Sequence, residues 1–223
     1  MRRILVAAVA ALMSAGVALG PAGAASAARA VVDDGTSDVF AMKYDVDTGA
    51  YYYPPMGSLP NTDVVRTTVK HTRTAVRFTA EYVDLVEGGD VSGPEFDVLL
   101  RLSTGLNATL NVWEDTPGTI DTFLWRPGTP HPKAPCAGVK GDVDYDKNVV
   151  TGSVPRSCLG DPAWVKFLGN ASSAPAVQPG TSWWEQFWYE DSAADDGYIT
   201  HELLRSPDCF TQCEGWSRRL HHG

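Results

Sequence analysis

The chain has 223 residues, of which 43% are hydrophobic and 20% charged, and its formal net charge at pH 7 is -9. An acidic surface repels phosphate, and no Lys/Arg cluster with interleaved aromatic residues offsets this repulsion. Nucleic acid and anionic membrane are therefore not expected as partners. The length fits one domain that can bury a core without help from a metal. We expect an acidic, monomeric protein.

Residues 1–30 have the pattern of an export signal. Arg2 and Arg3 precede an apolar run, and small residues follow it, with candidate cleavage sites after Ala27 and after Ala30. Ordinary secretion is favoured over the twin-arginine route, because the arginine pair lacks a preceding Ser or Thr. The signal predicts a secreted, extracellular protein that has no membrane segment after cleavage.

Segments that alternate apolar and polar residues, which is typical of half-buried strands, follow the signal. A strand is expected at 38–46, followed by an irregular aromatic loop at 47–60, whose prolines exclude a central strand. Two hairpins follow, the first from 63–71 with 74–84 and the second from 95–103 with 108–112. In the second hairpin, Glu95, Asp97 and Arg101 lie on the face opposite the apolar residues. A further strand is expected at 119–126.

A third hairpin is expected within 136–164, and the sequence specifies it in more detail than the other two. Period-two alternation on both sides of the turn Asp146-Lys147-Asn148 indicates two strands, and Pro155 removes a backbone donor and ends the second. After it, Asp161 and Pro162 have the character of an N-cap and a first helical residue, so a one-turn helix is expected there.

The remaining strands are expected at 164–168 and 183–189, with a Ser/Ala/Pro-rich link at 170–180. Many short alternating segments and no long amphipathic helix predict an all-β, antiparallel β-sandwich with a jelly-roll-like topology. The sandwich is expected to span 31–194. Residues 195–223 are expected to form a short, irregular, disulfide-bridged C-terminal appendage.

Four cysteines in an exported chain predict two disulfides. Of the three possible pairings, the local one is favoured, which joins Cys136 to Cys158 and Cys209 to Cys213. The first bridge would clamp the third hairpin, and the second would hold the appendage.

Three stretches, DVVRTTVKHT at 63–72, VDYDKN at 143–148 and VPRSCLGDPAWV at 154–165, carry a resemblance to other proteins. Through them the chain resembles a group of uncharacterised exported actinobacterial proteins, and its layout is similar to DOMON and family-9 carbohydrate-binding-like β-sandwiches. The resemblance covers most of 38–168. It implies ligand binding, in some such modules of sugar or haem, but no residue here matches a functional motif of those modules.

Two clusters are candidates for ligand binding. Asp142, Asp144 and Asp146 on one strand face could favour Ca²⁺, but a solvated outer face explains them better, so no metal and no cofactor is expected. Trp183, Trp184 and Trp188 belong to the densest aromatic cluster, at 183–189, and could stack against sugar rings. Alternatively, at least one face of that cluster belongs to the core.

The sequence has no Gly-x-Ser-x-Gly elbow, phosphate-binding loop or dinucleotide fingerprint, and no catalytic residue is predicted. A secreted, non-catalytic binding or scaffolding protein with an unknown extracellular ligand is therefore expected. The alternatives are a carbohydrate-binding module that uses the aromatics of 183–189 and a hydrolase whose catalytic residues are dispersed along the chain.

Overall fold

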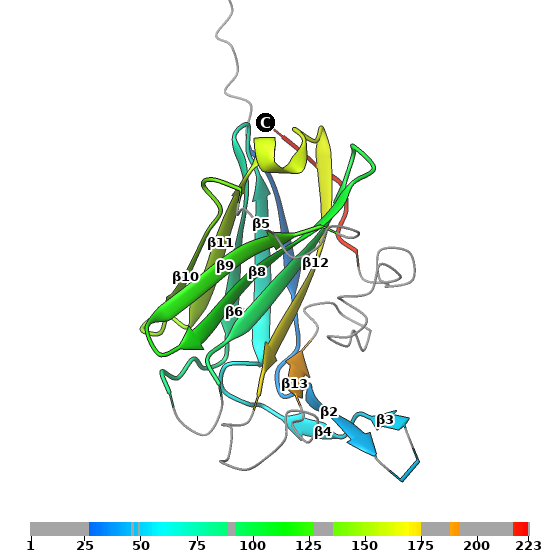
Figure 1. The fold of residues 1–223 in the computed structure, drawn as a ribbon, viewed down its shortest axis with the longest axis vertical. Helices are drawn as coiled ribbons and strands as arrows, with labels where there is room; N and C mark the ends of the chain where they lie inside the picture. The colour runs from blue at the N-terminus through cyan, green and yellow to red at the C-terminus, as the bar shows by residue number, and fades with distance from the viewer. Residues whose placement is uncertain are drawn as a thin grey trace, which may run out of the picture.

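The computed structural model describes residues 27–45, 47–48, 50–88, 92–126, 136–174, 188–191 and 216–222. Within these ranges the chain forms two antiparallel sheets that pack face to face, one 3-10 turn and no α-helix (Figure 1). The predicted all-β antiparallel sandwich is confirmed. None of the described residues belongs to a helix long and apolar enough to cross a membrane.

One sheet has five strands and is built mainly from two of the predicted hairpins. Its order is β1 (Ala28–Asp33), β5 (Val64–His71), β6 (Ala75–Tyr82), β11 (Val149–Pro155) and β10 (Lys140–Asp144). The hairpins β5–β6 and β10–β11 follow the sequence prediction, and they meet where β6 pairs with β11.

The second sheet has a path of seven strands. Its order is β3 (Ala50–Tyr52), β2 (Val39–Asp45), β13 (Trp188–Asp191), β12 (Trp164–Ser173), β7 (Glu95–Leu102), β8 (Asn107–Thr116) and β9 (Thr119–Trp125). Two further short strands, β4 (Pro55–Gly57) and β14 (Leu220–His221), pair with β2 and β12. The hairpin β7–β8 and the strand β9 confirm the sequence prediction. The aromatic loop is more ordered than expected, because β3 and β4 both pair with β2.

The core lies between the sheets and is made by alternate residues of each strand. Phe78 of β6 and Phe96 of β7 meet across it, with ring centroids 5.2 Å apart. On β11, Val150, Gly152 and Val154 are buried, and the residues between them face outward. This period-two burial is the pattern on which the prediction of a sandwich rested.

The third hairpin is clamped as predicted, because Cys136 and Cys158 form a disulfide with their Cα atoms 5.9 Å apart. In the chain-entropy model, a bridge across 22 residues stabilises the fold by about 3 kcal/mol. Cys209 and Cys213 lie outside the described residues.

The predicted helix start at Asp161 is wrong. The one helical turn, η1 (Arg156–Leu159), lies before this residue, and Gly160 ends the turn with a left-handed φ of 74°. The backbone N–H of Asp161 donates to Arg156 O, so this residue closes a helical turn and does not open one. Pro162 then leads directly into β12.

The C-terminal part of the sandwich also differs from expectation. β12 runs to Ser173, so the predicted link from 170 begins with four strand residues. Residues 216–222, at the end of the predicted appendage, pack on the sandwich. Ser217 exchanges backbone and side-chain hydrogen bonds with Phe167, and Leu220 is 2% exposed in the core. The rest of the predicted appendage, residues 195–215, lies outside the described residues.

Candidate ligand-binding face

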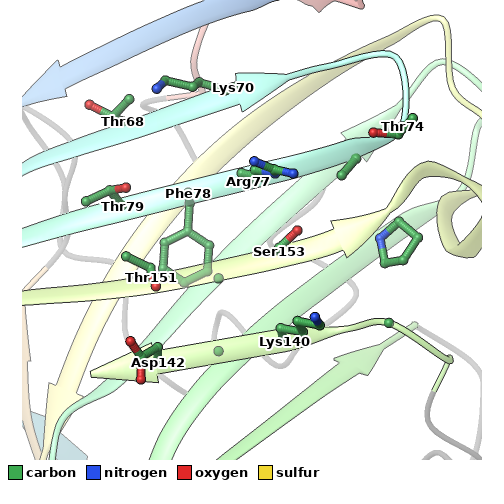
Figure 2. A pocket seen from close by; sticks show the side chains of 15 residues that line it. Thr68, Lys70, Thr74, Arg77, Phe78, Thr79, Lys140, Asp142, Thr151 and Ser153 are labelled. Atoms are coloured by element: carbon green, nitrogen blue, oxygen red, sulfur yellow. The ribbon is translucent and has the colours of Figure 1, made fainter. Parts of the chain in front are cut away.

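An open depression of about 800 Å³ lies on the outer face of the five-stranded sheet. It is lined from β5, β6, β11 and β10, whose side chains are shown in Figure 2. Its polar lining is made of hydroxyls and charged groups, namely Thr68, Lys70, Thr74, Arg77, Thr79, Lys140, Asp142, Thr151 and Ser153. The depression therefore presents hydroxyls and charged groups beside an apolar lining that includes Ala75, Phe78 and Pro155, and a ligand can reach it from solvent.

Four cations lie in one row across this face. The register pairs Arg29 with Lys70, Lys70 with Arg77, Arg77 with Ser153, and Ser153 with Lys140. Neighbouring strands are about 4.8 Å apart, so the five positions span about 19 Å. Figure 2 shows Lys70, Arg77, Ser153 and Lys140 on four neighbouring strands. All four cationic residues are exposed.

The cations of this row lack anionic partners within the part of the chain that the structure describes. No carboxylate there lies within 4.0 Å of the charged nitrogens of Lys70, Arg77 or Lys140. Arg29 Nη2 donates to the hydroxyl of Thr68, 3.5 Å away, on the same face. Like charges at paired positions destabilise a sheet, so this row does not have the arrangement that stability alone would favour.

A second row on the same face shows the ordinary arrangement. There, Arg66 is paired with Asp33 on one side and Glu81 on the other. Arg66 Nε lies 2.6 Å from Asp33 Oδ1, and Arg66 Nη1 lies 3.7 Å from Glu81 Oε2. Charges in this row alternate and neutralise each other, which makes the uncompensated row of cations a local exception.

A row of hydroxyls lies between the two charged rows. Thr68, Thr79 and Thr151 are in register on β5, β6 and β11, and Thr151 pairs with Asp142 on β10. A threonine hydroxyl both donates and accepts hydrogen bonds. The face therefore presents cations next to groups that can bind hydroxylated molecules.

The three aspartates predicted from the third hairpin do not converge on a metal site. Asp144 accepts the backbone N–H of Lys147 at 3.1 Å and forms an ion pair with the Lys147 ammonium group. These hydrogen bonds hold the pKa of Asp144 below its usual value. Asp142 lines the depression, and Asp146 lies in the turn. The solvated-face reading fits these positions.

The aromatic candidates are only partly covered by the structure. Trp183 and Trp184 lie outside the described residues. For Trp188, only the backbone is described, and it pairs with Met42 of β2. The sugar-stacking hypothesis for this cluster stays a prediction.

Two acidic residues that we expected on the open face of the second hairpin are in fact buried. Glu95 and Asp97 are 6% and 5% exposed. The amide nitrogen of Asn111 donates to both carboxylates, at 2.6 and 3.0 Å, and Ser172 Oγ donates to Glu95 at 3.3 Å. Because both carboxylates are buried and hydrogen-bonded, their contacts are those of residues that stabilise the fold.

The cation row could not be recognised in the sequence. Its members are dispersed between positions 29 and 140, and only strand pairing brings them together. The available signal was weak. Lys70 and Arg77 lie on the two arms of a predicted hairpin, and a register prediction would have placed them opposite each other.

No family model matches this chain, and no curated protein and no solved structure is significantly similar to it. These comparisons neither support nor oppose the resemblance to DOMON and family-9 carbohydrate-binding-like modules.

Proposed function

We propose that this protein is a secreted, non-catalytic β-sandwich that binds an anionic glycan on the outer face of its five-stranded sheet. The observation that carries the proposal is the row of Arg29, Lys70, Arg77 and Lys140, in which no cation forms an ion pair with a carboxylate of the described residues. Placing like charges on neighbouring strands costs stability, and a ligand that carries negative charges would offset the cost.

The hydroxyl row supports a sugar as the carrier of these charges. Thr79 and Thr151 lie one row away from the cations, are partly exposed and can hydrogen-bond sugar hydroxyls. An acidic sugar chain lying along the cations would meet positive charge and hydroxyls at the same time. A long nucleic acid would extend beyond the row and meet the repulsion of a protein with a net charge of -9.

A titration with two sugar chains of equal length tests the proposal. Oligogalacturonate carries a carboxylate on each unit, and cello-oligosaccharide carries none. We expect calorimetry to show binding of the acidic chain only, with affinity falling as salt is raised. The double variant Lys70→Ala/Arg77→Ala should weaken binding by about 2- to 30-fold, because each exposed charge pair contributes about 0.2–1 kcal/mol.

Arg66→Ala is the matched control, because Arg66 lies on the same sheet face but already pairs with Asp33 and Glu81. Its affinity for the acidic chain should equal that of the wild type. The melting temperature of the double variant should not fall, since the substitutions remove repulsion between neighbouring cations. Equal affinity of wild type and double variant would contradict the proposal.

The same titration separates the two alternatives. Binding of the neutral chain that is lost in Trp188→Ala would favour the aromatic cluster as the binding site. Shortening of either chain during the experiment would favour a hydrolase.

A further inference from the structure

Three carboxylates converge at the end of the sandwich where β13 and β2 lie (Figure 1). Asp38 directly precedes β2, Asp63 directly precedes β5, and Asp191 ends β13. One oxygen of each lies within 4.8 Å of the others. Because β5 and β2 belong to different sheets, the cluster lies where the two sheets meet.

The backbone around the cluster holds these side chains in place. Ser37, with a left-handed φ of 66°, donates its N–H to Asp63 Oδ2 at 2.9 Å. Val64 N–H donates to Asp191 Oδ2 at 2.6 Å. At Gly35, a Cβ atom would lie 2.6 Å from Asp38 Oδ2, so the Asp38 carboxylate packs directly against this glycine.

Asp63 provides a second, independent sign of a ligand. Its side chain is fully buried, and among the described residues its Oδ1 has no hydrogen-bond donor. A buried carboxylate oxygen without a partner is costly, and proteins normally provide a donor or a cation for it. No Lys, Arg or His of the described residues forms an ion pair with Asp38 or Asp63.

We propose that Asp38, Asp63 and Asp191 bind a calcium ion that joins the two sheets at this end of the sandwich. Calcium–oxygen distances are about 2.3–2.6 Å, so ligand oxygens on opposite sides of the ion are about 4.6–5.2 Å apart. The three carboxylate oxygens lie within 4.8 Å of one another, which is close enough for one ion to contact all three. Calcium suits an irregular loop site better than magnesium, which demands near-octahedral geometry.

The carboxylates of this cluster repel one another. Burial and the negative charges of Asp34, Asp38 and Asp63 together raise the pKa of Asp191 to about 8, although the hydrogen bond from Val64 N–H opposes the rise. A divalent cation would remove this mutual repulsion. The calcium site is separate from the cation row and does not depend on glycan binding.

Thermal unfolding of chelator-treated protein, with and without calcium chloride, tests the site. At a free calcium concentration about 100 times Kd, the melting temperature should rise by about 5–10 °C. Magnesium chloride should give a smaller rise. Asp63→Asn and Asp191→Asn should abolish the response, whereas Asp142→Asn and Asp144→Asn, in the acidic stretch of the third hairpin, should retain it.

The variants of the two buried aspartates could fail to fold for reasons unrelated to calcium. Asp38→Asn then tests the site by itself, because Asp38 is exposed. This variant should fold and lose most of the calcium response. The alternative explanation is that the three carboxylates are held together by shared protons and bind no metal. In that case calcium would leave the wild-type melting temperature unchanged, and Asp191→Asn would raise it without calcium. That result would overturn the proposal and leave the proposed glycan binding unaffected.

Discussion

At Arg77, stability and the proposed glycan binding favour different residues. Its strand neighbours in the row are Lys70 and Ser153, and no described carboxylate lies within ion-pair distance of its guanidinium group. A glutamate at this position could form an ion pair with Lys70, as Glu81 and Asp33 do with Arg66. Stability alone would favour such an exchange by about 0.2–1 kcal/mol, because a cross-strand repulsion would become an attraction.

His71 is a buried residue whose charge state should couple stability to pH. Its side chain is fully buried, and Nδ1 lies 2.8 Å from the carbonyl oxygen of Leu220 on β14. Burial lowers the pKa of His71 below 6.5, and the positive charges of Arg156 and His222 lower it further, although the hydrogen bond to Leu220 opposes this. The folded state therefore favours the neutral ring.

The sign of the pH effect follows from this shift in pKa. Below about pH 6.5 the unfolded chain binds a proton at His71 that the folded protein resists, so stability should fall as the pH drops toward the folded pKa. We expect urea midpoints at pH 7.5 and 5.5 to differ more in the wild type than in His71→Gln. Equal pH dependence of both proteins would contradict this expectation. The raised pKa of Asp191 acts in the opposite direction, and comparing the two proteins cancels its effect.

The central strand β11 depends on a glycine that packs against an aromatic ring. Gly152 lies opposite Phe78 in the register, and a Cβ atom at Gly152 would lie 2.1 Å from Phe78 Cε1. Gly141, the neighbour on β10, is equally tight, because a Cβ atom there would lie 2.3 Å from Thr122 Oγ1 of the other sheet. Gly152 leaves room for the Phe78 ring of its own sheet, and Gly141 lets the second sheet approach β10 closely.

Gly152→Ala should lower the free energy of unfolding by about 1–3 kcal/mol, because the Phe78 ring must move within a packed core. Urea denaturation measures the change. Ser153→Ala is the control on the next, outward-facing position, and its effect should stay within about 0.5 kcal/mol. A Gly152→Ala variant as stable as the wild type would show that the ring has room to move.

The three hairpins could be predicted because each is encoded locally, by period-two alternation on both sides of a short turn. The turn before β11 is an example, since Asn148 has the left-handed φ of 55° that its residue type tolerates. The prediction of a helix start at Asp161 failed because of Gly160, the residue before it. Gly160 favours the left-handed backbone that ends a helical turn, and the turn is formed by the residues that precede it.

The candidate sites depend on contacts that are distant in sequence, which is why neither could be predicted. The cation row requires the pairing of β6 with β11, which joins two separate hairpins. The calcium cluster requires Asp38, Asp63 and Asp191 to meet from three separate segments. Alternation predicts which residues face outward on a strand, but it does not predict which strands become neighbours.

The first strand bears on the extent of the mature chain. β1 begins at Ala28 and pairs with β5 from there on, so cleavage after Ala27 would leave the strand whole, whereas cleavage after Ala30 would remove its first three residues. We expect N-terminal sequencing of the secreted protein to find Ala28 first. A mature chain that begins at Val31 would contradict this and would also lack Arg29, the first cation of the row.

The disulfide between Cys136 and Cys158 bears on where the proposed binding face would be complete. β10 is an edge strand whose one neighbour in its sheet is β11, and it begins at Lys140, four residues after Cys136. In the reducing cytosol this edge would be free to fray, which would move Lys140 away from the other cations. Under the proposed export and glycan binding, the row of cations would then be complete only in an oxidising compartment, after the protein has left the cytosol.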